Sequence, residues 1–217
     1  MATILIYGAG TQSLAILPSL HKAGYRIVML TGSHPNYGDK SRYVNKVYRY
    51  NIETEANTLE ALLHVIDNEH PNVIIPMGDD GAEFLSKHLN DFKGIAIKLP
   101  SYPNFLRGYD KNQLMALCCE KGYPHPQTID LSIVDYQSEE AKTFPYPAML
   151  KPNCTTGGRG MVYVATYAEC MAKYPALHEQ YGEYHLQKFI EPGGSQVKVQ
   201  LDIDEQKQLV ASSVQQK

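Results

Sequence analysis

Short apolar runs alternate with helix-like segments through the first half of the chain, and this alternation limits the fold more than any other feature of the sequence. The run at 3–7 is almost entirely apolar, as expected for a strand buried on both faces. Similar runs occur at 26–31, 47–50 and 73–76, and segments with apolar residues at helical spacing lie between them. Alternating strands and helices with short links predict an α/β fold with a parallel, doubly wound sheet.

The pattern changes close to Pro100. Residues 101–109 contain a proline and a glycine and are predicted to be a linker, followed by a helix at 110–121. The remainder predicts antiparallel strands with one helix, and the last strand lies so near the end that we interpret this domain as incomplete. Those strands are expected at 148–151, 161–164, 184–190, 196–203 and 208–213, and the helix at 166–181. We therefore predict a Rossmann-like domain at 1–100 and an α+β domain at 101–217.

Composition excludes several classes of protein. Apolar residues make up 43% of the chain and charged residues 20%, with a net charge of -3 and no basic cluster, which argues against a nucleic-acid partner. No apolar run reaches the roughly 18 residues that a membrane span needs. The four cysteines and eight histidines show no metal-ligand spacing, so we expect reduced thiols, a cytoplasmic protein and no zinc.

A glycine turn follows the first strand and opens a helix. Gly8, Gly10, Thr11 and Gln12 stand where a dinucleotide-binding turn has its phosphate contacts, and a helix N-terminus favours anions. The third glycine of that motif is replaced by Ser13, and the second strand ends without the acidic residue that binds a ribose hydroxyl. We favour a purely structural turn over a nicotinamide site, and contact with a substrate anion stays open.

Asp79 and Asp80 directly follow the strand at 73–76. The carboxyl ends of strands in an open α/β sheet face the ligand crevice, so both aspartates are candidate substrate contacts. An Asp-Gly turn that caps a helix explains them equally well.

A second group of residues suits phosphate binding. The apolar strand at 148–151 ends in Lys151, whose buried ammonium needs an anionic partner. Thr155, Thr156, Gly157, Gly158 and Gly160 follow, and backbone amides in such a loop can approach phosphate oxygens closely. The lysine precedes the glycines, so this is not a P-loop, and a plain glycine-rich β-hairpin is the alternative.

The order of several motifs carries a family resemblance. The segments DK (110–111), GYPHPQT (122–128), YPAMLKP (146–152), TTGGRG (155–160) and LQKFIE (186–191) occur in this order along the chain. Together they resemble the ATP-grasp superfamily, with the greatest similarity to biotin carboxylase and to the large chain of carbamoyl phosphate synthetase. The first half is similar to the pre-ATP-grasp domain of that superfamily, and the ATP-clamping lobe would lie at about 125–190.

The resemblance implies a role for each matching residue. Lys111 and Lys151 would reach the phosphates, and the loop containing Thr155, Thr156, Gly157, Gly158 and Gly160 would fold over them. The backbone of Gln187, Lys188, Phe189 and Ile190 would bind adenine, between the apolar side chains of Met149 and Ile190. Gln196 stands where many members have an acid for the ribose hydroxyls, and the Phe189 side chain is expected in the core of its strand.

The implied activity is that of an ATP-dependent ligase. A carboxylate would be activated by ATP as an acylphosphate and then attacked by an amine or ammonia, as in carbamoyl phosphate synthesis. The superfamily holds Mg²⁺ through carboxylates in a later lobe, so no metal ligand is expected within these residues, and this chain is expected to bind ATP without catalysing. The alternatives are an NAD(P)-dependent Rossmann oxidoreductase and a non-catalytic nucleotide-sensing module.

Overall fold

The computed structural model describes residues 1–204 and 206–216, so positions 205 and 217 of the predicted second domain lie outside the described residues. The chain divides into two compact units, Met1–Leu117 and Cys118–Lys217. The division by compactness therefore falls within a helix after the predicted boundary at residue 100. The two units are described separately below.

The first unit is built on a parallel sheet. Its strand order is β3-β2-β1-β4, and every neighbouring pair runs parallel. The strands are β1 (Thr3–Tyr7), β2 (Arg26–Thr31), β3 (Lys46–Arg49) and β4 (Val73–Pro76), and the helices between them are α1 (Thr11–Lys22) and α2 (Glu55–Glu69), with α3 (Asp79–Lys87) after β4. The predicted α/β class with a parallel sheet is confirmed.

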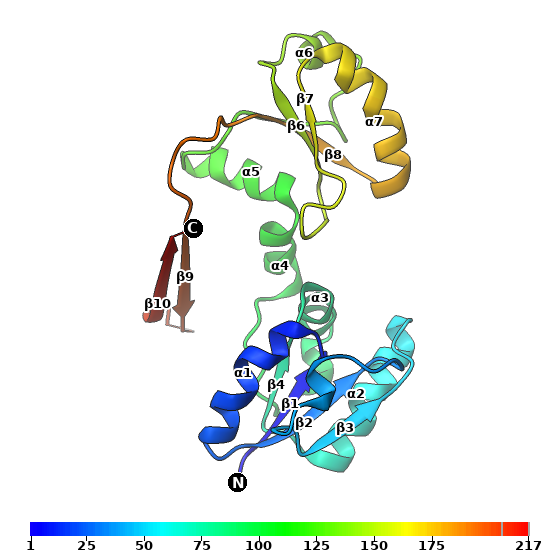
Figure 1. Cartoon of the computed structure of the whole chain (residues 1–217), viewed down its shortest axis with the longest axis vertical. Coiled ribbons are helices and arrows are strands. Elements are labelled where there is room, and N and C mark those ends of the chain that lie inside the picture. The colour runs from blue at the N-terminus through cyan, green and yellow to red at the C-terminus, as the bar shows by residue number, and fades with distance from the viewer. Residues whose placement is uncertain (205, 217) are drawn as a thin grey trace. The chain divides into compact units, whose positions relative to one another are not determined.

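Helices cover both faces of this sheet (Figure 1). Ile4 and Ile6 of β1 pack with Leu17 of α1 on one face. Leu5, between them in sequence, packs with Leu62 of α2 on the other. Because successive strand side chains point to opposite faces, an uninterrupted apolar run is what a sheet covered on both sides requires.

The predicted linker at 101–109 is wrong, because most of it is a helix. Helix α4 (Tyr102–Tyr109) begins with Pro103 in its first turn, where a missing N–H costs no hydrogen bond. Helix α5 (Lys111–Lys121) follows after Asp110, whose Oδ1 accepts the Asn112 N–H at 2.9 Å. Two short 3-10 helices, Gly38–Lys40 and Leu89–Phe92, complete the first unit.

The second unit contains an antiparallel sheet with the order β5-β8-β6-β7. Its strands are β5 (Thr128–Asp130), β6 (Ala148–Pro152), β7 (Val162–Val164) and β8 (Tyr184–Lys188), and its helices are α6 (Glu139–Lys142) and α7 (Tyr167–Tyr181). Cys170 and Tyr174 of α7 pack on Leu150 and Leu186 of the sheet to form the core. The predicted antiparallel half is confirmed.

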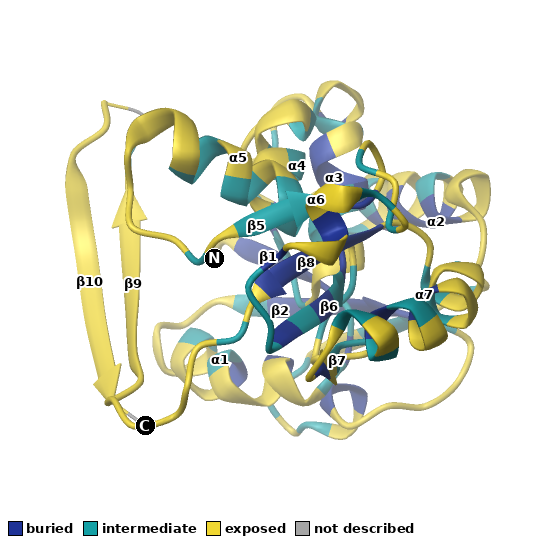
Figure 2. Ribbon diagram, turned by 90° about the horizontal axis from the view of Figure 1, so that it is seen from above, coloured by how far each residue is buried: buried dark blue, intermediate teal, exposed yellow. Residues whose placement is uncertain are grey.

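A separate hairpin ends the described chain. Strands β9 (Val197–Ile203) and β10 (Leu209–Gln216) pair antiparallel, and both are exposed along their whole length (Figure 2). No helix in the described part of the chain is long and apolar enough to cross a membrane.

Candidate functional site

The sheet of the second unit has two chemically different faces. Along β6, Ala148 and Leu150 are fully buried in the core with α7. Met149 and Lys151 alternate with them and therefore point to the opposite face. The strand pairing extends this alternation across the sheet, so the residues opposite Met149 and Lys151 share their face.

Two rows of side chains cross that face. Lys151 is paired with His185 of β8, which is paired with Asp130 of β5. In the adjacent row, Met149 is paired with Gln187 on one side and Tyr163 on the other, and Gln187 with Thr128. This face is polar towards β5 and carries apolar side chains towards β7.

Lys151 is held by a side-chain hydrogen bond from a neighbouring strand. Its Nζ donates to Oε1 of Gln187 at 2.5 Å, and Nε2 of Gln187 donates to Oγ1 of Thr128 at 3.1 Å. Oγ1 of Thr128 in turn donates to the carbonyl of Pro126 at 2.9 Å. Gln187 is 7% exposed, and a buried amide needs hydrogen-bond partners for both its oxygen and its nitrogen.

Residues 153–161 form the glycine-rich loop between β6 and β7. Gly157 and Gly158 adopt φ values of 65° and 74° and are exposed, in the left-handed region that glycine enters without strain. Within the loop, Oγ1 of Thr155 donates to the Arg159 carbonyl at 3.0 Å, and Arg159 Nη2 donates to Oγ1 of Thr156 at 3.1 Å. The tip is therefore held by its own side chains, and its glycines leave backbone amides uncovered.

Gly160 differs from the other two loop glycines. A β-carbon at this position would lie 2.7 Å from Cγ of Pro152 and 2.9 Å from the Tyr184 hydroxyl. The Tyr184 hydroxyl donates to the Gly160 carbonyl at 2.9 Å, and burial raises the pKa of Tyr184 to about 12, so it keeps its proton. Gly160 thus anchors the loop to the sheet, a role that the sequence did not indicate.

The other end of the loop is anchored by a buried pair. Nδ1 of His185 lies 2.8 Å from Oδ1 of Asn153, and these residues are 1% and 7% exposed. Neither residue stood out in the sequence. The alternation of β8 places His185 beside Lys151, and only the strand pairing reveals it.

The predicted hinge at 187–190 lies where β8 ends. The N–H of Lys188 donates to the Gln127 carbonyl at 2.9 Å and that of Phe189 to the Pro147 carbonyl at 3.0 Å. In the described chain, no backbone carbonyl accepts the N–H of Ile190. One backbone donor of the hinge is thus available for a ligand, while the two before it are used in the sheet.

The Phe189 side chain does not lie in the core, contrary to expectation. It follows the end of β8, is half-buried, and meets Tyr163 edge to face with ring centroids 5.0 Å apart. Tyr163, which sequence reasoning missed, is 45% exposed on the face that carries Met149. Its position between Val162 and Val164, which pack in the core, is the alternation that could have revealed it.

The hinge continues into a hollow of about 650 Å³ lined by residues 189–196. Phe189, Ile190 and Gln196 all contribute to its wall. The residue predicted to contact ribose therefore lines the same space as the predicted adenine residues.

Lys111 belongs to the first compact unit, at the start of α5. Asp110 before it accepts N–H groups of Asn112 and Gln113 and so begins the helix. Its predicted phosphate contact stays a prediction, because the other predicted phosphate residues belong to the second unit.

The predicted substrate residues come together at one edge of the first sheet. Tyr7 of β1 is paired with Pro76 of β4, so the turn at 8–12 and the pair Asp79 and Asp80 both follow the carboxyl ends of adjacent strands. Gly8 has φ 107°, which a side chain would strain. This is the edge at which ligands bind open α/β sheets, and the role of these residues stays a prediction.

Two contacts around the glycine turn count against a dinucleotide. The N–H of Gly38 donates to the Ala9 carbonyl at 2.8 Å, so the chain packs its own segment on the turn. The first acid after β2, Asp39, is engaged inside the protein, since its Oδ2 lies 2.9 Å from Nη2 of Arg49 and accepts the Asn36 N–H at 3.0 Å. Its other oxygen, Oδ1, is buried, so a ribose hydroxyl could reach this carboxylate only if the surrounding residues moved.

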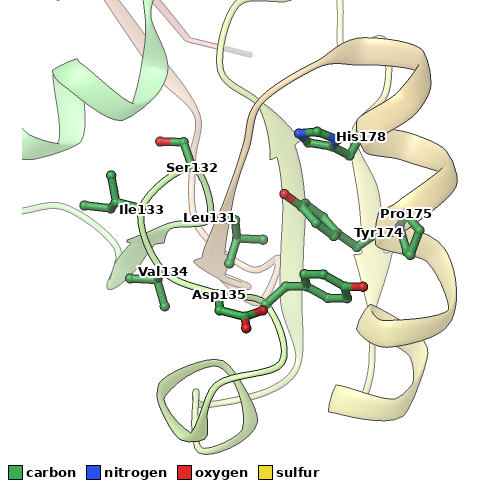
Figure 3. Close-up of a pocket in the computed structure, with 9 residues that line it drawn as sticks. Leu131, Ser132, Ile133, Val134, Asp135, Tyr174, Pro175 and His178 are labelled. Atoms are coloured by element: carbon green, nitrogen blue, oxygen red, sulfur yellow. The ribbon is translucent and has the colours of Figure 1, made fainter.

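A further cavity of about 430 Å³ lies on the helix side of the second sheet, between residues 131–136 and α7 (Figure 3). Tyr174 and His178 project from α7 towards the loop that contains Leu131. No predicted site residue lines it. Across residues 1–204 and 206–216, no group of three or more His, Cys, Asp or Glu side chains is placed to hold a metal ion.

The comparisons with known proteins concern the fold. No family model matches the chain. The biotin carboxylase of Campylobacter jejuni, solved as a beta-gamma-ATP complex, is similar at a TM-score of 0.76 and 18% identity over 96% of this chain and 49% of that one. In fold, the chain is similar to ATP-grasp enzymes.

Two further solved structures agree. The L-amino acid ligase of Bacillus licheniformis has a TM-score of 0.74 at 13% identity, covering 99% of this chain and 50% of that chain. The biotin carboxylase domain of a Hydrogenobacter thermophilus 2-oxoglutarate carboxylase was solved with MgADP and bicarbonate. It has a TM-score of 0.70 at 18% identity, covering 87% of this chain and 44% of that chain. This chain therefore spans about half the length of each of these three structures.

Proposed function

We propose that this chain is the nucleotide-binding part of an ATP-dependent ligase of the ATP-grasp type. The observation that carries the proposal is the face of the second sheet that brings together Lys151, Gln187, Met149 and Tyr163, beside the glycine-rich loop. A basic group, an apolar patch and uncovered loop amides are the groups that a nucleoside triphosphate requires.

The direction of β6 orders these groups. Ala148 is paired with Lys188 at the hinge end of the sheet, and the strand runs from there to the glycine-rich loop. Met149 and Lys151 are two residues apart, about 7 Å along the strand. Adenine would lie against Met149, Tyr163 and Phe189 with the Ile190 N–H as donor, and the phosphates would extend towards Lys151 and the loop.

The proposed reaction uses the positive charge at the phosphate end of this face. A carboxylate oxygen would attack the γ-phosphorus of ATP, the bond to the β-phosphate oxygen would break, and ADP would leave. An amine or ammonia would then attack the acylphosphate carbon and expel inorganic phosphate. Lys151 and the loop amides would stabilise the transferring phosphoryl group, and Mg²⁺ would neutralise further phosphate charge.

Nucleotide binding by the chain of 217 residues tests the proposal. We expect ATP and ADP to raise its melting temperature and NADH to leave it unchanged. Replacing the ammonium in Lys151→Met should weaken ADP binding at least tenfold, measured by calorimetry, because one phosphate contact is lost. Lys142→Met, which removes an exposed lysine paired with Glu139 on α6, is the matched control and should bind as the wild type does.

Stabilisation by NADH but not by ATP would contradict the proposal. Because the chain spans about half the length of the matched enzymes, we further propose that it binds ATP without turning it over. Release of phosphate from ATP by these residues alone, at a rate abolished in Lys151→Met, would show the opposite.

A further inference from the structure

Gln187 occupies an unusual position for a neutral side chain. It lies diagonally across the strand pair from Lys151, since Lys151 is paired with His185 and Gln187 is two residues further along β8. Its Oε1 accepts from the lysine ammonium at 2.5 Å on a face where the proposed ligand carries several negative charges. This hydrogen bond restricts the positions that Nζ can take.

The orientation of the amide is set from its other end. A glutamine amide can turn over and exchange its oxygen and nitrogen, and presenting nitrogen to Lys151 would place two donors face to face. Oγ1 of Thr128 accepts from Nε2 at 3.1 Å, and its own proton is given to the Pro126 carbonyl at 2.9 Å. Because Thr128 can only accept from Gln187, it directs the oxygen of the amide towards Lys151.

The neutrality of Gln187 has an electrostatic consequence. A carboxylate at this position would also accept from Lys151, but its negative charge would offset much of the field that the ammonium exerts on a nearby phosphate. An amide oxygen supplies the hydrogen bond without that charge. The hydrogen bond to Gln187 therefore does not reduce the attraction of Lys151 for a polyphosphate.

We propose that Gln187, oriented by Thr128, is a positioning residue that holds the Lys151 ammonium for the phosphates of the nucleotide without neutralising it. This inference rests on the proposed nucleotide site and adds how its selectivity for phosphate arises. The ratio of ADP affinity to adenosine affinity distinguishes this role from a purely structural one. Only the affinity for ADP depends on the charge at Lys151.

The test compares ADP and adenosine binding by calorimetry for the wild type, Gln187→Glu and Gln137→Glu. Gln137 is an exposed glutamine of the same unit, so its variant introduces the same charge away from Lys151. We expect Gln187→Glu to weaken the affinity for ADP about tenfold and to change the affinity for adenosine less than twofold. Gln137→Glu should change neither affinity. The salt dependence of ADP binding should also become shallower in Gln187→Glu.

A second pair of variants addresses the orienting group. Thr128→Val keeps the shape but removes the acceptor, so the amide can turn over, and we expect a severalfold loss of ADP affinity that Thr128→Ser restores. Unchanged ADP affinity in Gln187→Glu, or equal losses of ADP and adenosine, would overturn the inference while leaving the proposed function intact. A wild type that binds neither ligand would overturn both.

Discussion

Gly157 and Gly160 show how one residue type has two different roles within a single loop. Both have positive φ, 65° and 73°, but only Gly160 lacks room for a side chain. We expect Gly160→Ala to lower the free energy of unfolding by about 3 kcal/mol, because backbone strain and a contact with Pro152 are added together. Gly157→Ala should lower the free energy of unfolding by only about 1 kcal/mol, because it adds backbone strain without a steric contact.

Urea denaturation followed by circular dichroism would measure both variants. Because the φ values nearly match, the difference between them isolates the steric contact at Gly160. Equal losses would mean that Pro152 and Tyr184 move aside, and that the anchoring of the loop to the sheet is not rigid.

Three elements of the first unit are tied together by one carboxylate at the end of α2. Glu69 accepts from Nζ of Lys46 at 2.7 Å and from the Tyr48 hydroxyl at 2.5 Å on β3, and lies 2.5 Å from Nη1 of Arg26 on β2. The hydrogen bond from Lys46, then those from Tyr48 and Arg26, lower the pKa of Glu69 from 4.5 to about 2. They also offset the unfavourable position of an anion at a helix C-terminus.

This depressed pKa predicts a specific pH dependence of stability. The folded-state pKa lies below the unfolded value, so the stabilisation is complete above pH 4.5 and is lost as the pH falls towards 2. At neutral pH, the free energy of unfolding of Glu69→Gln should be lower than that of the wild type by on the order of 2 kcal/mol. This difference should shrink as the pH falls below the pKa of Glu69 in the unfolded chain. Urea denaturation at several pH values measures this, and a difference that does not depend on pH would contradict the assignment.

At the scale of the whole molecule, the sheets differ in how far their strands are buried. Val199, Leu201 and Val214 share one face of the hairpin β9–β10 and are 57%, 60% and 67% exposed. A two-stranded ribbon without a covering layer is marginally stable in water. We expect hydrogen exchange, followed by mass spectrometry, to be at least tenfold faster in this hairpin than in β6 and β8.

Leu201→Thr tests whether the stability of the hairpin is independent of that of β6 and β8. It removes apolar surface from the exposed face of the hairpin, so protection of β6 and β8 should stay as in the wild type. Slower exchange in the hairpin than in β8, whose residues Tyr184–Gln187 are buried, would show that the apolar face is covered in solution.

The sequence predicted well the elements whose residues carry a strong local pattern. The run at 3–7 and the lysine that ends the strand at 148–151 lie in strands as expected. Strand β5 and helix α6, with three and four residues, are too short to show a period and were missed. The linker prediction is wrong because Pro103 and Gly108 lie near the two ends of α4, where a helix tolerates both residue types.

The sequence by itself determined the parallel α/β half, the antiparallel half and the candidate residues near Lys151, because local periodicity and turn chemistry are properties of neighbours along the chain. Only the tertiary structure decided that Gln187 and Thr128 hold Lys151, that Tyr163 faces Met149, and that Gly160 is an anchor. Those contacts join residues up to 59 positions apart. Strand register brings them together, and register depends on how whole faces pack.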